Sequence, residues 1–195
     1  MKKNITYLVI LTLLATFFVA CEDSKEDQVE QTFDRSLVLL NWSDNIITPS
    51  YEAFQEKLGK LKTSVDKFKS DVTQENLDLV RSEWLNAYKG WQHVEMFNIG
   101  KAEEIYYSSK MNVYPANISR IKSNIDSEQY DLNNANNNPA QGFPALDYLL
   151  YGGISDGYKV IDRFLSQDGD KYLSYLENCV NQMTSLTKTV VDDWK

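Results

Sequence analysis

The chain has 195 residues, 28 of them acidic and 20 basic, so its formal net charge at pH 7 is −8. A negative charge of this size argues against binding to nucleic acid and against adsorption to anionic lipid. The length suffices for one domain with a sizeable core, and four prolines and eight glycines mark few breaks in it.

The N-terminus predicts a bacterial lipoprotein signal peptide over residues 1–20. Lys2 and Lys3 precede an apolar run that ends at Ala20 and is too short to be a preferred membrane span. The run leads into Phe18-Val19-Ala20-Cys21, which resembles the lipobox of bacterial lipoproteins. We therefore expect Cys21 to become the acylated first residue, whose lipid holds the protein on a membrane. An uncleaved N-terminal anchor is the alternative.

Residues 21–31 are expected to form an acidic, solvated tether after the lipidated cysteine. Within it, Glu22-Asp23-Ser24-Lys25-Glu26-Asp27 resembles the signals that send some lipoproteins to the cell surface. The predicted location is therefore the bacterial cell envelope, at the outer membrane, with the domain facing the periplasm or the outside. Cys179 is the second of two cysteines, so acylation of Cys21 would leave no intrachain disulfide.

Residues 32–195 are expected to form an all-α, up-and-down helical bundle, because apolar residues recur every three or four positions and strand-like alternation is nearly absent. A short first helix is predicted over Phe33–Ile47. Thr48 and Pro49 then supply a cap and a first-turn proline for the next helix. The apolar stripe of that helix comprises Tyr51, Phe54, Leu58, Leu61, Val65 and Phe68. The stripe of the last helix comprises Tyr172, Leu176, Cys179, Met183, Leu186, Val190 and Trp194.

A long helix is predicted from about Thr73 to Ile99. Its buried face comprises Leu77, Val80, Trp84, Ala87, Tyr88, Trp91 and Val94. On a regular helix Glu95 would lie about 40° from Trp91, within this face, whereas His93 would lie about 200° away and be exposed. Glu95 is therefore a candidate ligand. The alternative is a buried carboxylate that only accepts hydrogen bonds from Arg81, a tyrosine hydroxyl or an amide.

A long irregular connection is expected after this helix. Pro115 disfavours the helical conformation at Tyr114, so the segment around them is predicted to break the helix. A short helix is predicted over Ala116–Ile125. The asparagine-rich segment Asp131–Gly142 is predicted to be a loop.

The segment Gly142–Gly152, with the sequence GFPALDYLLYG, places one carboxylate in an otherwise apolar helix. Because Asp147 is flanked by Leu146 and Tyr148, we expect it to be partly buried. A buried carboxylate is costly unless a cation or several hydrogen-bond donors hold it. The segment is therefore a candidate site.

Three segments together resemble the imelysin family in order and spacing. They are Arg81-x-x-Trp84 followed by Trp91-Gln92-x-x-Glu95, then a Tyr114-Pro115 turn, then GFPALDYLLYG. The resemblance covers roughly Leu37 to Trp194. It implies a helical protein of the bacterial envelope, built from two related halves and in many members lipid-anchored. It also implies a role in iron uptake or metal binding, and some members of the family are classed as metallopeptidases.

The chain departs from the family's later motif, which reads like G-x-H-x-x-E. With Gly142 aligned to the first position, Pro144 stands at the histidine and Asp147 at the glutamate. Proline has no side-chain ligand for a metal, which removes the best support for a peptidase. The sequence ends at Trp194-Lys195 without a glycine cap, so we expect the first half of an imelysin-like protein only, as a truncation or a single-half variant.

The sequence thus predicts that Glu95 and Asp147 face a shared cleft, with Arg81, Tyr114 and Tyr148 around it. Carboxylates and tyrosine hydroxyls suit a hard cation, such as iron or calcium, or a small ligand. The alternative is a metal-free surface interaction protein that uses the bundle as a scaffold for an envelope partner. A metallopeptidase is less favoured, because catalytic zinc takes three protein ligands and the chain has one histidine.

Overall fold

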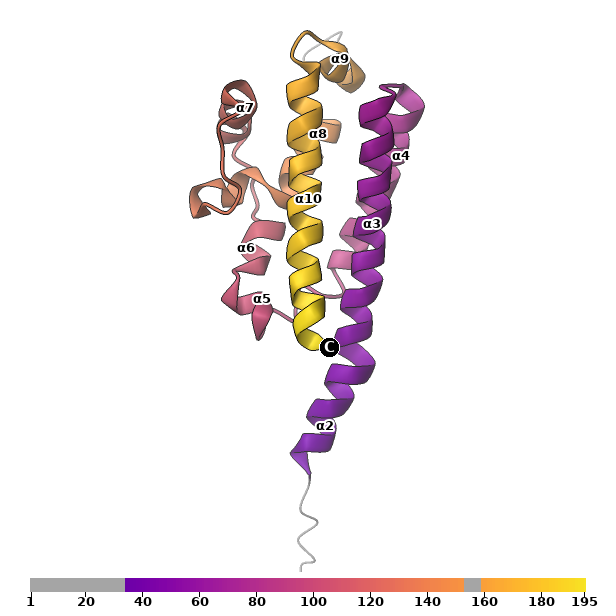
Figure 1. The fold of residues 1–195 in the computed structure, drawn as a ribbon, viewed down its shortest axis with the longest axis vertical. Helices are drawn as coiled ribbons and strands as arrows, with labels where there is room; N and C mark the ends of the chain where they lie inside the picture. Colours follow the sequence, from indigo (N-terminus) through magenta and orange to yellow (C-terminus); the bar gives the residue numbers. More distant parts are fainter. Residues whose placement is uncertain (1–33, 153–158) are drawn as a thin grey trace, which may run out of the picture. The chain divides into compact units, whose positions relative to one another are not determined.

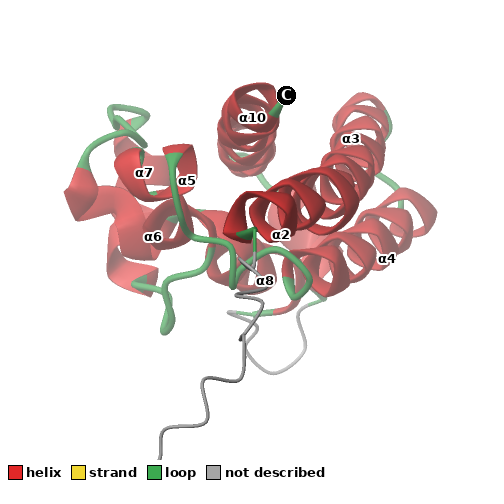
Figure 2. Cartoon of the chain, turned by 90° about the horizontal axis from the view of Figure 1, so that it is seen from below, coloured by secondary structure: helices red, strands yellow, loops and turns green. Residues whose placement is uncertain are grey.

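The structure is a computed structural model that describes residues 34–152 and 159–195. Every regular element in this part of the chain is a helix, which confirms the all-α prediction (Figure 2). Residues 36–195 form one compact unit. The predicted signal peptide and tether lie outside the described residues. Among the described helices, none combines the length and the apolar character needed to cross a membrane.

Three long helices form the frame of the unit: α3 (Thr48–Ser70), α4 (Gln74–Trp91) and α10 (Gly169–Trp194). Helix α3 contacts both of the others, and in Figure 1 it runs beside α10. The six residues of the stripe predicted for α3 are all buried. Of the seven predicted for α10, four are buried and three are half-buried. These two predictions are confirmed.

The chain enters α3 through a continuous helix, not through a cap. Helix α2 (Arg35–Trp42) passes into a π-helical turn, η2 (Ser43–Ile47), and then directly into α3. The predicted cap at Thr48 is wrong, because this residue is itself helical and its side-chain oxygen has no partner. Pro49 crowds the turn before it and lacks an N–H, and the wider π turn at that place accommodates both effects.

Helix α4 begins as predicted but ends earlier. Thr73 accepts a hydrogen bond at 3.3 Å from the backbone N–H of Asn76, as a cap should. The helix ends at Trp91, and residues 92–96 form turns. The turns bury Val94 and bring the Phe97 carbonyl to 3.0 Å from the Tyr51 hydroxyl, which donates to it. The predicted continuation to Ile99 is therefore wrong.

The irregular connection contains four short helices: α5 (Lys101–Glu104), α6 (Tyr107–Met111), α7 (Ile118–Ser127) and the 3₁₀ helix η3 (Ala135–Ala140). A cis Tyr114–Pro115 bond separates α6 from α7, at the predicted break. The connection is held on α10 by buried hydrogen bonds. The Tyr175 hydroxyl donates to the Ala140 carbonyl at 2.6 Å and accepts from Asn124 at 3.0 Å.

Helix α8 (Gly142–Tyr151) lies behind α10 in Figure 1 and contacts α4, α9 (Val160–Leu165) and α10. Eight of its ten residues are buried. Pro144 is one of them, at the third helical position, where a backbone N–H has no partner within the helix. Proline therefore fits the first turn at no cost in hydrogen bonds.

Gly142 is required by the geometry at the start of α8. Its φ of +70° lies in the left-handed region. A Cβ at this position would lie 2.1 Å from the carbonyl oxygen of Met111, the last residue of α6. Any other residue would push α8 away from α6.

Gly142→Ala is expected to lower the free energy of unfolding by about 2 kcal/mol or more, because alanine costs about 1–2 kcal/mol in this conformation before the clash is counted. Urea unfolding followed by circular dichroism measures the effect. Gly59→Ala is the control, since nothing lies within 4 Å of a Cβ there. In the middle of α3 it should stabilise by about 0.5–1 kcal/mol. Equal effects of the two changes would contradict the argument.

Candidate functional site

Two residues of α4 hold α8 at both of its ends. The Nε and Nη2 atoms of Arg81 donate to the Leu150 carbonyl at 3.0 and 2.8 Å. The Trp84 Nε1 atom donates to the Phe143 carbonyl at 3.4 Å, near the other end. Because residues three apart lie on one face of a helix, the R-x-x-W spacing lets both side chains of α4 donate hydrogen bonds to α8.

A second arginine, Arg163 of α9, binds further carbonyls at the end of α8 and just beyond it. Its Nη1 donates to the carbonyls of residues 148 and 149 at 3.1 and 2.7 Å, and its Nη2 donates to the Gly152 carbonyl at 2.5 Å. The guanidinium also lies 5.1 Å from the Tyr148 ring centroid. Helix α8 has no basic residue in its last turn, so arginines from α4 and α9 supply the positive charge that a helix C-terminus favours. The sequence analysis missed Arg163, although this lack was visible in the sequence.

The α4–α8 surface comprises Arg81, Trp84, Tyr88, Asp147 and Tyr151. Trp84 stacks on Tyr88 with ring centroids 5.5 Å apart and planes at 4°. Tyr151 meets Trp84 edge-on at the same centroid distance, and the Arg81 guanidinium lies 5.0 Å above the Tyr151 ring. Trp84 and Tyr88 are half-buried, and Tyr151 is 41% exposed. The surface is thus an aromatic layer that one side of α8 shares with α4.

Asp147 lies on this surface and is exposed, so its burial is only partial, as expected. It is one helical turn from Phe143 and one from Tyr151, on the side of α8 that faces solvent. Partial desolvation nevertheless raises the pKa of Asp147 above its ordinary value of 3.8. Burial also raises the pKa of Tyr151, the charge of Arg81 lowers it and that of Asp147 raises it, so both charged groups act on Tyr151.

The raised pKa of Asp147 has a consequence for stability. The folded chain binds this proton more tightly than the unfolded chain does. Ionisation of Asp147 therefore lowers the free energy of unfolding as the pH rises above 3.8 and through the folded pKa. At neutral pH the carboxylate is charged and less well solvated than in water, and a cationic ligand would compensate for this.

The other predicted residues do not join Asp147. Glu95 is exposed in the turns after α4, because the helix ends before it. Tyr114 is 83% exposed, and Tyr148 is buried under Arg163. Burial accounts for the raised pKa of Asp147 without a contribution from another carboxylate. The structure thus links Asp147 and Arg81 through Tyr151, in place of the shared cleft with Glu95. Exposure of His93 was predicted and is confirmed.

A metal ion needs several ligands at one place. Among residues 34–152 and 159–195 there is no group of three or more His, Cys, Asp or Glu side chains that could hold one. Cys179 is buried, and burial raises its pKa to about 12, so it is not a thiolate at neutral pH. The described side chains therefore do not fit a bare cation that the protein alone coordinates.

The chain is similar to known proteins over most of its length. The family model described as "Peptidase_M75: Imelysin" matches residues 47–195. Iron-regulated protein A of Synechococcus elongatus is 22% identical over 138 residues, which cover 71% of this chain and 36% of that protein. The crystal structure of a Parabacteroides distasonis protein, assigned as an iron-regulated protein A precursor, matches with a TM-score of 0.67 and 20% identity. It covers 82% of this chain and 44% of that one, so the chain spans less than half the length of either relative.

Replacing Arg163 by methionine is expected to lower the free energy of unfolding by about 2 kcal/mol, because buried carbonyls of α8 lose a charged donor. Urea unfolding measures the loss, and hydrogen exchange should increase at the end of α8. Lys188→Met is the control, because the Lys188–Asp192 pair is largely exposed and contributes at most about 0.5 kcal/mol. A loss no larger than that of the control would show that Arg163 does not hold α8.

Proposed function

The chain belongs to the imelysin family, and from this membership we propose that it is a lipid-anchored protein of the bacterial envelope with a role in an iron-related process. Two relatives support the link to iron, since both carry the name iron-regulated protein A. The lipobox-like sequence that ends at Cys21 supports the anchor. Both points are proposals for this chain.

We further propose that the α4–α8 surface is a binding site and not a catalytic one. The observation that carries this proposal is Asp147, a partly desolvated carboxylate one helical turn from Tyr151, whose ring also lies beneath the Arg81 guanidinium. One carboxylate cannot chelate a bare cation, because hard cations take six or more oxygen ligands. It can, however, bind a metal complex that brings its own ligands, or a small cationic ligand that also contacts the ring faces.

A metal-free interaction scaffold is the second candidate. It is favoured because residues in the segments that resemble the family have structural roles. Arg81, Trp84 and Gly142 all hold α8 in place, so the fold alone accounts for them. Peptide hydrolysis is not proposed, because catalytic zinc takes three protein ligands and the described residues supply no such group.

Asp147→Asn separates the two candidates. Binding of a ferric chelate, supplied as the nitrilotriacetate complex, should raise the Tm of the wild-type protein by linkage, and the variant should lose most of this increase. Calcium alone should give no increase in either protein. Without ligand, the variant should be as stable as the wild type at pH 7 or more so, because it lacks the costly ionisation.

Glu103→Gln removes an exposed carboxylate on α5 and should keep the full response to the ferric chelate. If the chelate does not stabilise the wild type, or stabilises Asp147→Asn equally, the binding proposal is wrong and the scaffold proposal stands.

The lipid anchor has its own test. When the full chain is expressed in a bacterial host, the wild type is expected in the membrane fraction, with an acylated Cys21 at its N-terminus by mass spectrometry. Cys21→Ser should abolish the acylation and leave the membrane fraction. A purified protein that retains residues 1–20 and has an unmodified Cys21 would refute the anchor.

A further inference from the structure

Helix α2 exposes all of its large apolar side chains. The exposed fractions are 63% for Leu37, 62% for Leu39, 56% for Leu40 and 53% for Trp42. No residue of α2 is buried. A helix that is apolar on several sides is normally buried against another element or a membrane, because exposed apolar surface is unfavourable in water.

The apolar surface of α2 continues onto the bundle. A hollow of about 350 Å³ adjoins it, lined by Trp42, Ile46, Ile47, Met96, Phe97 and Ile99. All six lining residues are apolar. Met96 and Ile99 come from the segment after α4 and are 67% and 49% exposed. We call α2 together with this hollow the apolar end of the unit.

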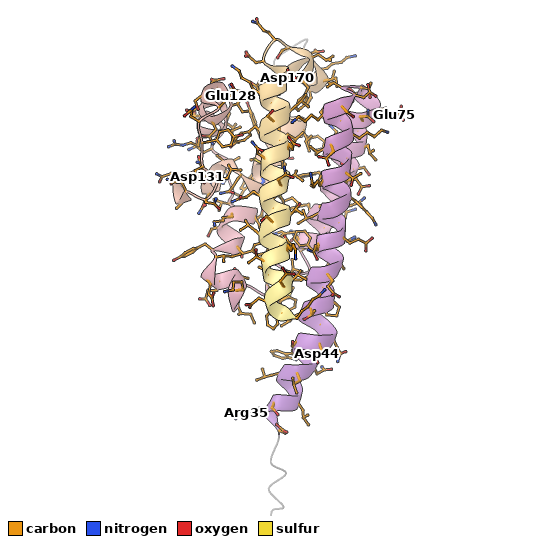
Figure 3. The ribbon with its side chains drawn as sticks, in the orientation of Figure 1. Arg35, Asp44, Glu75, Glu128, Asp131 and Asp170 are labelled. Atoms are coloured by element: carbon orange, nitrogen blue, oxygen red, sulfur yellow. The ribbon has the colours of Figure 1, made fainter. Side chains whose placement is uncertain are left out.

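The charges around the apolar end are few and of both signs, and Arg35, the first residue of α2, is exposed. Asp44 lies in η2 and Glu95 precedes Met96, and both are exposed. Neither η2 nor residues 92–99 contain lysine or arginine. Figure 3 places Asp44 beside α2 and Glu75 at the opposite end of the bundle. Attraction to anionic headgroups therefore does not explain the surface, whereas apolar contact does.

The apolar end lies close in sequence to Cys21, which indicates that its partner is the membrane. Helix α2 begins 14 residues after Cys21, a distance of at most about 50 Å even when the chain is fully extended. A lipid on Cys21 would hold α2 at a high local concentration beside the bilayer. Trp42 adds the side chain that membrane interfaces favour, with an apolar body and one polar N–H.

We propose that the apolar end lies in the interfacial layer of the membrane, so that α2 is a second contact beside the lipid. This inference rests on the proposed anchor at Cys21. Burial of the apolar side chains of α2 in the interfacial layer would add to the attachment that the lipid on Cys21 gives. Large apolar side chains from α2, η2 and residues 96–99 form this surface, and a lipid layer matches such a surface better than a polar partner does.

The test attaches the protein to a membrane independently of acylation in the cell. Residues 21–195, which retain the whole compact unit 36–195, are coupled through Cys21 to a maleimide lipid in phosphatidylcholine vesicles. Cys179 should not react, because it is buried and burial raises its pKa to about 12. Brominated phosphatidylcholine quenches tryptophan that enters the bilayer. About a quarter of the emission should be quenched, since Trp42 is one of four tryptophans.

Trp42→Phe should abolish the quenching, and Leu39→Asp should remove most of it without lowering the Tm, because no residue of α2 is buried. Leu165→Asp is the matched control. Leu165 is exposed to the same 62% as Leu39, but it lies on α9, at the opposite end of the bundle in Figure 1. The control should be quenched like the wild type.

Absence of quenching in the coupled wild-type protein would overturn the inference, as would equal effects of Leu39→Asp and Leu165→Asp. A vesicle-free dimer that Leu39→Asp converts to a monomer, without quenching of the wild type on vesicles, would assign the apolar end to a second copy of the chain and also overturn it. These outcomes do not depend on acylation in the cell, so failure of the anchor proposal remains separate.

Discussion

The structure depends on the hydrogen bonds that the backbone carbonyls at the C-terminal end of α8 accept inside the bundle. The last carbonyls of any helix lack partners within it, and those of α8 lie where eight of ten residues are buried. The guanidinium groups of Arg81 and Arg163 donate hydrogen bonds to these carbonyls and so fix α4 and α9 relative to α8. Trp84 and the close approach of Gly142 to Met111 act at the other end, so α8 is held at both of its ends. The α4–α8 surface is the outer side of this arrangement.

The long helices could be predicted because their apolar residues follow the helical period without interruption. The end of α4 could not, since its stripe continues through Val94 and nothing local ends it. A residue far away holds the turns that follow, since the Tyr51 hydroxyl donates to the Phe97 carbonyl. The π turn before Pro49 was also missed. A helix was expected up to Ile47, but Thr48 and Pro49 were interpreted as a new start, whereas the helix continues through the π turn.

The candidate site was located in the correct segment but for a partly wrong reason. Apolar neighbours in sequence do not bury Asp147, because successive residues of a helix point in different directions. The burial argument needed the neighbours at three and four residues, of which Phe143 and Tyr151 are aromatic, and the carboxylate is only partly desolvated. Pairing with Glu95 assumed a helix that had already ended. The roles of Arg81 and Trp84 depend on contacts across 69 and 59 residues, which no local pattern shows.

The helix continues without a break from α2 through η2 into α3, so α2 is a rigid extension of the bundle. A flexible linker would let the domain tumble freely above the layer that holds it. A helix that continues into the central helix of the unit instead transmits its own tilt to every element packed on α3. With α2 lying in the membrane interface, the α4–α8 surface would be held at one height and one angle above the bilayer. Ligands would then reach it from a defined direction.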